Sequence, residues 1–225
     1  AGSAAEERDA GAGATLSING AMSGHMVETP HLRLTPRYEA NASDDAKARE
    51  VVAELRRGIA RYADHRTALA DGYQIFLPNV PQKVYHCTNY RRAIAATFGF
   101  DPAEPTSLLY EKTDAGYKLV GAMYTASRGA SLDALNGRVP LSVGQWHAHT
   151  NICVPPRGQE ARWRESRNGT PLFGPQGSIA SKGECDAAGG RFFPQLFGWM
   201  LHVNTAAGDD PKAIWGTEHG GGHSH

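Results

Sequence analysis

The spacing of apolar residues changes at Gly72, and this change limits the folds open to the chain. Between residues 41 and 71, apolar side chains recur about every 3.6 residues, which predicts an amphipathic helix. After Gly72 the apolar runs are short and are separated by Pro and Gly; Pro78 and Pro81 cannot extend the helix, because proline lacks a backbone N–H. We therefore expect an α+β fold, in which a long N-terminal helix packs on a mainly antiparallel β-sheet.

Three later segments carry the pattern of β-strands. Residues 107–113 and 117–126 are rich in Tyr, Leu and Val and are joined by a short turn that contains Gly116, which predicts a hairpin. Residues 145–153 alternate, and residues 192–204 (FFPQLFGWMLHVN) form a mostly apolar run. The candidate site is expected on this sheet or at its edge.

Length and charge set further bounds. The 225 residues suffice for one domain with flexible tails, which we place as an arm over 1–40, an α+β metal-binding domain over 41–205 and a His-rich tail over 206–225. Lys plus Arg and Asp plus Glu both number 23, so nothing in the charge balance points to nucleic acid. No apolar run reaches the roughly 18–20 residues of a membrane span.

The N-terminus and the cysteines favour an exported protein. The chain starts without Met, as after removal of a signal peptide, so we expect a periplasmic or secreted location. Cys153 and Cys185 bracket a stretch rich in Gly, Pro and Arg that a disulfide would close, leaving Cys87 free. Three reduced, buried thiols are the alternative.

His147 and His149 are the pair hardest to explain as ordinary packing. They lie two residues apart in QWHAHTNIC, so on a strand both imidazoles project from one face, with Trp146 and Ala148 on the other. At this spacing, the imidazoles of His147 and His149 could both bind the same metal ion.

Two further histidines extend the candidate site. His86 and His202 also fall in extended or strand-like segments, which gives a set of four histidines that could bind copper, zinc, nickel or iron. Glu111 on the first hairpin strand could act as a base towards a metal-bound water, or could simply pair with Lys118. The chain has no HExxH motif, and no glutamate follows the HxH pair closely as in a cupin.

Over roughly residues 41–205, the chain resembles an uncharacterised family of exported bacterial proteins. Four segments carry the resemblance: YHCTNY, PTSLLYEKTDAGYKLVGAMY, WHAHTNICVPP and GGRFFPQLFGWMLHV. In a more distant branch of that family, a His followed by Asn, a Leu-Tyr-Glu strand and a late His strand recur. These features would match His86, Glu111 and one of His147, His149 or His202. The resemblance implies export and a shared site, and it names no substrate.

Three functions are open at this point. The first is a metal-binding protein, with copper as the main candidate and zinc as the alternative, that buffers, stores or delivers the ion; Met200 could add a weak ligand for copper. The second is a mononuclear metalloenzyme with three His ligands, an open position and Glu111 as base. The third is a structural zinc domain.

Several peripheral residues bear on the partners of such a site. A metal-exchange protein would serve delivery, and the Arg-rich stretch at Arg157, Arg162, Arg164 and Arg167 could form a lid that receives a small anionic ligand. Met22, His25 and Met26 in the arm, and His219, His223 and His225 in the tail, could capture a metal ion before it enters the site.

Overall fold

Helix α2 (Asp44–Ile59) is the long helix that the sequence predicts, but it ends earlier than predicted. In this computed structural model, which describes residues 26–76, 78 and 84–215, its buried side chains recur with the helical period. After Ile59 the chain changes to a 3₁₀ helix. Asp64 then takes an extended conformation and caps the next helix by accepting a hydrogen bond from the backbone N–H of Arg66. The predicted helix over 41–71 is therefore three consecutive segments: α2, the 3₁₀ helix η1 (Ala60–Ala63) and α3 (His65–Ala70).

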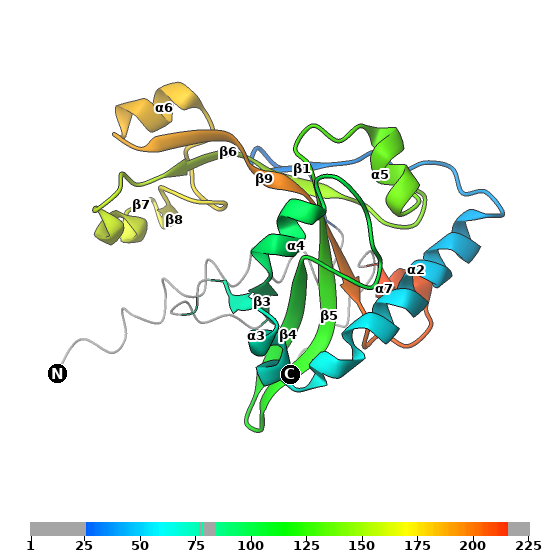
Figure 1. Cartoon of the computed structure of the whole chain (residues 1–225). Helices are drawn as coiled ribbons and strands as arrows, with labels where there is room; N and C mark the ends of the chain where they lie inside the picture. Colours follow the sequence, from blue (N-terminus) through cyan, green and yellow to red (C-terminus); the bar gives the residue numbers. More distant parts are fainter. Residues whose placement is uncertain (1–25, 77, 79–83, 216–225) are drawn as a thin grey trace, which may run out of the picture.

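Seven strands form one sheet in the order β1-β6-β9-β5-β4-β3-β2, and every pair of neighbours is antiparallel (Figure 1). The predicted hairpin is β4 and β5, and the last predicted strand is β9, which lies between β6 and β5. The α+β class and the antiparallel sheet are thus confirmed. The strands are β1 (Leu32–Leu34), β2 (Gln74–Ile75), β3 (Val84–Thr88), β4 (Ser107–Thr113), β5 (Gly116–Ala126), β6 (His147–Val154) and β9 (Arg191–Asn204).

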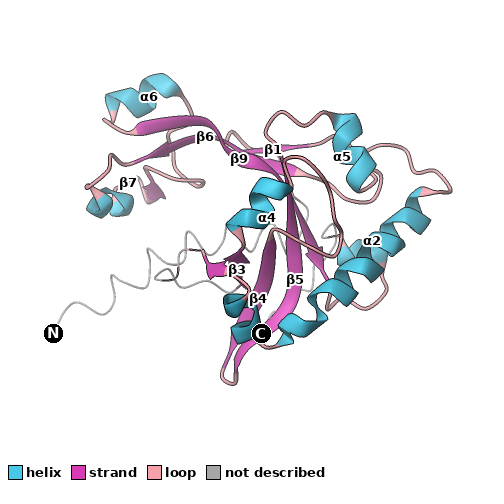
Figure 2. Cartoon of the chain, viewed as in Figure 1, coloured by secondary structure: helices cyan, strands magenta, loops and turns pink. Residues whose placement is uncertain are grey.

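The main hydrophobic core lies on one face of the sheet, which we call the helix face. Side chains of α2 such as Leu55 pack there with Leu108, Ala122 and Leu201 of the strands. Figure 2 shows α2 beside the sheet and the shorter helices around it. These shorter helices are α4 (Tyr90–Ala95), α5 (Leu132–Arg138) and α7 (Pro211–Ile214).

β6 and β9 extend past the other strands and carry a second unit of structure, seen at the upper left of Figure 1. We call residues 155–190 the disulfide lobe. The predicted disulfide between Cys153 and Cys185 is present, with 5.6 Å between the two Cα atoms, and it joins the end of β6 to a helix of the lobe. The lobe contains η2 (Glu160–Arg164), β7 (Ser166–Arg167), β8 (Thr170–Pro171) and α6 (Lys182–Ala187).

Two short elements lie in segments that the sequence predicts as tails. β1 falls within residues 1–40 and pairs with β6, where Leu32 lies opposite His149. α7 falls within residues 206–225 and buries Ile214 against the main core. Both elements are too short to show a periodic pattern, so their positions depend on the partner that they pack on. Met22, His25, His219, His223 and His225 lie outside the described residues.

The described residues include no helix that is both long enough and apolar enough to cross a membrane. The Cys153–Cys185 disulfide is the kind of bond that persists in oxidising compartments outside the cytoplasm.

Candidate metal site

The four predicted histidines share the face of the sheet opposite α2, which we call the histidine face. On β6, Trp146 and Ala148 pack in the main core, so the alternation places His147 and His149 on the other side. The same argument applies to the other two strands. His202 lies between Leu201 and Val203 of the core, and His86 of β3 precedes Cys87 of the core.

The four rings form one continuous row. The Nε2 atoms of His86 and His202 lie 3.1 Å apart. The ring of His147 stacks on that of His202, with centroids 5.1 Å apart and planes inclined by 15°, and the ring of His149 meets His147 edge-on at 5.6 Å. The sequence-predicted histidines are therefore brought together, from three strands that are distant in the chain.

The contact between His86 and His202 requires the sheet to curve. β3 and β9 are separated by β4 and β5, so on a flat sheet their backbones would lie about 14 Å apart, too far for two imidazoles to touch. Two irregularities in the strand register, at Leu109/Tyr110 and between His147 and His149, flank the row. Because bulges bend strands, they account for a concave histidine face.

Two methionines lie among the histidines. Met123 of β5 is directly opposite His202, and Met200 of β9 is directly opposite His147. Both are buried in a small apolar cluster with Val84 and Leu109. The sequence draws attention to Met200, whereas Met123 becomes a candidate only once the pairing of β5 with β9 is known.

Burial keeps the histidines neutral near physiological pH. His147 is 1% exposed, and His86 and His202 are each 8% exposed. Burial is the main cause that lowers the pKa of His86 to about 4 and that of His147 to about 3, with a smaller contribution from neighbouring histidines. It also lowers the pKa of His149 and of His202. A neutral imidazole has one ring nitrogen with a free lone pair, which is the form that binds metal ions.

Two of the buried ring nitrogens lack a partner. Among the described residues, the Nδ1 atoms of His147 and His202 have no hydrogen-bond partner. The indole Nε1 atoms of Trp146 and Trp199 are in the same state, but an indole N–H is a donor only and offers no lone pair. The imidazoles are therefore the unpartnered groups that could ligate a metal ion.

The side chains are not arranged as a closed four-histidine site. In the described part of the chain, no three His, Cys, Asp or Glu residues converge to hold a metal ion. The Nε2 atoms of His86 and His202 have the expected spacing, because two nitrogens bound to one metal at about 2.0–2.1 Å are separated by about 3 Å.

Glu111 shares the histidine face without touching the histidines. It lies opposite Val84 on β3 and opposite Lys118 on β5. The structure gives no hydrogen bond or ion pair between its carboxylate and any of the four rings. The role of base predicted for Glu111 therefore remains an expectation from the sequence.

The Arg-rich stretch forms part of the disulfide lobe. Arg162 binds the carboxylate of Glu165 at 2.6 Å, donates to the carbonyl oxygen of Ala188 and lies over the ring of Phe173. Arg162 thus holds the lobe together, and nothing in these contacts supports its predicted role in a lid for an anionic ligand.

His31 is a buried histidine that the sequence analysis does not single out. Its Nε2 lies 2.7 Å from the carbonyl oxygen of Gly177 and its Nδ1 lies 3.1 Å from that of Asn151. The backbone of Asn151 has a φ of 53°, so the strand alternation of His147 and His149 breaks there, and the side-chain amide of Asn151 donates to the carbonyl oxygen of Pro30. His31 therefore joins β1, β6 and the lobe.

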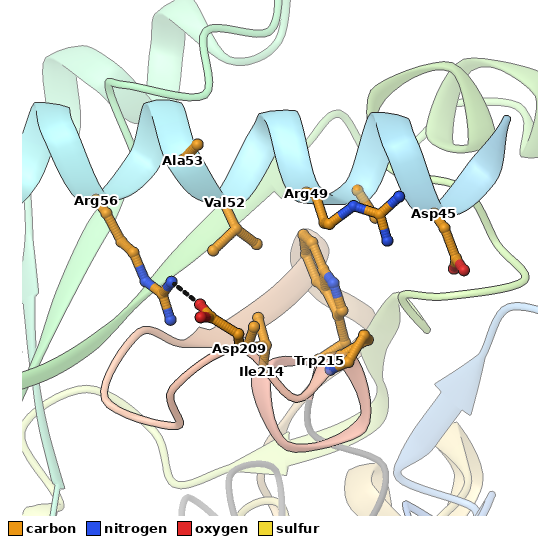
Figure 3. A pocket seen from close by; sticks show the side chains of 10 residues that line it. Asp45, Arg49, Val52, Ala53, Arg56, Asp209, Ile214 and Trp215 are labelled. Atoms are coloured by element: carbon orange, nitrogen blue, oxygen red, sulfur yellow. Dashed lines mark hydrogen bonds and ion pairs between the residues drawn. The ribbon is translucent and has the colours of Figure 1, made fainter.

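A hollow between α2 and α7, on the helix face, contains none of these histidines (Figure 3). Val52 of α2 faces Ile214 and Trp215, and Arg56 closes one end through an ion pair of 3.0 Å with Asp209.

Comparison of the chain with protein-family models, curated proteins and solved structures finds no match. The case for a function therefore depends on the histidine face itself.

Proposed function

We propose that the protein binds one transition-metal ion, copper in the first place, on the histidine face, and that it stores or delivers this ion outside the cytoplasm. The observation that carries the proposal is the row of four buried imidazoles, in which the Nε2 atoms of His86 and His202 lie 3.1 Å apart although their strands are distant in the chain. An ion bound between these two Nε2 atoms would replace the contact that they make with each other. The buried Nδ1 atom of His147 has no hydrogen-bond partner in the described residues, which costs free energy, and it is a further nitrogen in the same row.

The donor set favours copper over zinc. Copper binds nitrogen ligands more tightly than zinc does, and it accepts the thioether sulfur that Met123 and Met200 offer beside the rings. A structural zinc site needs four convergent ligands, whereas no three convergent His, Cys, Asp or Glu residues occur within residues 26–76, 78 and 84–215. Zinc remains the alternative to be measured.

Storage or delivery requires no catalytic group, and this agrees with the surroundings of the histidines. The metalloenzyme alternative assigns a base to Glu111, whose carboxylate has no contact with the rings. A delivery role would need a metal-exchange partner protein. The disulfide supports a periplasmic or secreted location for that exchange.

The proposal is tested by measuring the metal content of purified protein. Wild-type protein equilibrated with copper and then dialysed should retain one ion per chain. A His86→Gln/His202→Gln variant should bind copper at least about 100-fold more weakly, because it loses the two nitrogens with the correct spacing. Elemental analysis and competition with a chelator of known affinity give both quantities, and zinc is assayed in the same way.

A matched control is His65→Gln. His65 lies on α3 and packs against Tyr117, away from the histidine face. This variant should keep the wild-type copper content. The proposal would be overturned by equal copper retention in the folded wild type and the folded double variant, since the metal would then be held elsewhere.

A further inference from the structure

We infer that the site selects copper in its monovalent state, Cu(I), and that the thioether sulfurs of Met123 and Met200 complete the donor set that His86 and His202 begin. This inference rests on the proposed function and specifies its ion. Three independent features of the histidine face support it: the strand register, the absence of a contacting carboxylate within the described residues and the number of convergent nitrogens.

The register places each sulfur beside an imidazole. Directly opposed residues on antiparallel strands have Cβ atoms about 4.5–5.5 Å apart, and both His202 with Met123 and His147 with Met200 are such pairs. Methionine has three rotatable side-chain bonds, so its sulfur can move towards an ion without a change in the backbone. Met123 and Met200 are 8% and 6% exposed, and they pack together with Val84 and Leu109, so both methionines are buried on the same face of the sheet as the rings.

The charge of the donor set favours an ion with a single charge. Among the described residues, no hydrogen bond or ion pair joins a carboxylate to any of the four histidines. The neighbouring charges that influence the pKa of His86, His147 and His202 all belong to other histidines. A buried ion here would be bound by neutral ligands alone, and the cost of burying an ion rises with the square of its charge. A monovalent ion therefore fits better than a divalent one.

The number of convergent nitrogens agrees with a mixed site. A zinc site takes at least three ligands of the His, Cys, Asp or Glu type, and the described residues do not bring three together. Soft thioether ligands select Cu(I), and a site built from two imidazoles and two thioethers needs only the one nitrogen pair that is present. Silver, Ag(I), has the same charge and softness and serves as a probe that does not change its oxidation state.

The experiment compares Cu(I) with divalent ions in single Met123→Leu and Met200→Leu variants. Leucine keeps the volume of methionine and removes the sulfur. Cu(I) affinity, measured without oxygen against a Cu(I) chelator, should fall at least about 10-fold in each variant, while zinc affinity should change by less than about 3-fold. Unchanged Cu(I) affinity in both folded variants would overturn the inference.

Nuclear magnetic resonance of ¹³C-labelled methionine methyl groups gives a second measurement with an internal control. The chain has only four methionines, and the two Leu variants identify the signals of Met123 and Met200. Titration with Ag(I) should shift these two signals in wild-type protein and in the His65→Gln control. Binding of Ag(I) without such shifts would contradict the proposed ligands.

The two proposals can fail separately. If the His86→Gln/His202→Gln variant loses copper while both Met→Leu variants keep full Cu(I) affinity, the site is a histidine site and the inference about sulfur is wrong. If wild-type protein retains neither Cu(I) nor any divalent ion, the proposed function itself is wrong.

Discussion

At the scale of single residues, two glycines allow the strands to bend around the histidines. A Cβ atom at Gly198 would collide with the backbone carbonyl oxygen of Ala126, and one at Gly121 would collide with that of Val203. Each glycine lies at an irregularity in the strand register, and Phe197, next to Gly198, has a φ of 65°. The curvature that joins His86 to His202 therefore depends on positions without a side chain.

A Gly198→Ala substitution should lower the free energy of unfolding by at least about 2 kcal/mol, because the obstructing atom belongs to the backbone and cannot rotate away. Urea denaturation followed by circular dichroism measures this change. Gly137→Ala is the matched control. Gly137 lies in α5 with open space around it, so alanine there should leave stability unchanged or raise it by up to about 1 kcal/mol. Equal effects at the two positions would contradict the steric argument.

At the scale of elements, β6 and β9 connect the histidine face to the disulfide lobe. The disulfide joins residues separated by 32 positions, and a small core of Phe173 and Ile179 surrounds it. This cluster is separate from the main core under α2. The lobe is thus held by a crosslink and by few large apolar side chains, while the sheet is held by the main core.

Removal of the disulfide should therefore loosen the lobe first. In a Cys153→Ala/Cys185→Ala variant, the lost loop constraint costs about 3–4 kcal/mol, and amide hydrogen exchange should accelerate in β7, β8 and α6. Protection of β4 and β5 should change much less. The control is Cys87→Ala, which removes a buried cysteine on the helix face without breaking a crosslink. Faster exchange that is uniform over the sheet and the lobe would contradict this picture.

Elements with a strong local pattern could be predicted from the sequence. The β4–β5 hairpin follows from its alternation and turn, and the pair His147 and His149 follows from the period of a strand. The break at Asp64 could not be foreseen in the same way, because Tyr62 beyond α2 continues the apolar period and is itself buried. β1 could not be predicted, because three residues carry no period and its place is set by pairing with the edge of β6.

At the scale of the whole molecule, the buried histidines couple folding to pH. Their folded-state pKa values lie below the value of about 6.5 that an exposed histidine has; burial lowers that of His86 to about 4 and that of His147 to about 3. The unfolded chain therefore binds protons that the folded protein excludes. Stability is fully present above pH 6.5 and decreases as the pH falls from 6.5 towards 4 and then 3.

Metal-free protein in a chelator should lose about 1.4 kcal/mol of unfolding free energy per pH unit for each such histidine below pH 6. Urea unfolding at a series of pH values between 7.5 and 5 measures the slope. The His86→Gln/His202→Gln variant should show a smaller slope, because two of the groups with a lowered pKa are gone. His65→Gln should keep the wild-type slope. Identical slopes in all three proteins would contradict the assignment.

The sequence can name the candidate histidines, but which donor groups lie together in the site depends on the order of the strands. His86 and His202 are separated by 116 positions, and no local pattern indicates that their rings meet. Met123 joins them because β9 passes between β5 and β6, which only the folded sheet establishes. Residue type and local spacing could name the four histidines, but the long-range register decides which donors share one space.

The central position of β9 also fixes when the site can exist. Ribosomes make β3, β4 and β5 well before β9, so His86 and Met123 emerge while His202 and Met200 are still to be synthesised. The sheet is complete only after β9 has inserted between β5 and β6, which are made earlier. On the proposed function, a chain that is exported before β9 has paired would arrive without its ion and would acquire it in the destination compartment.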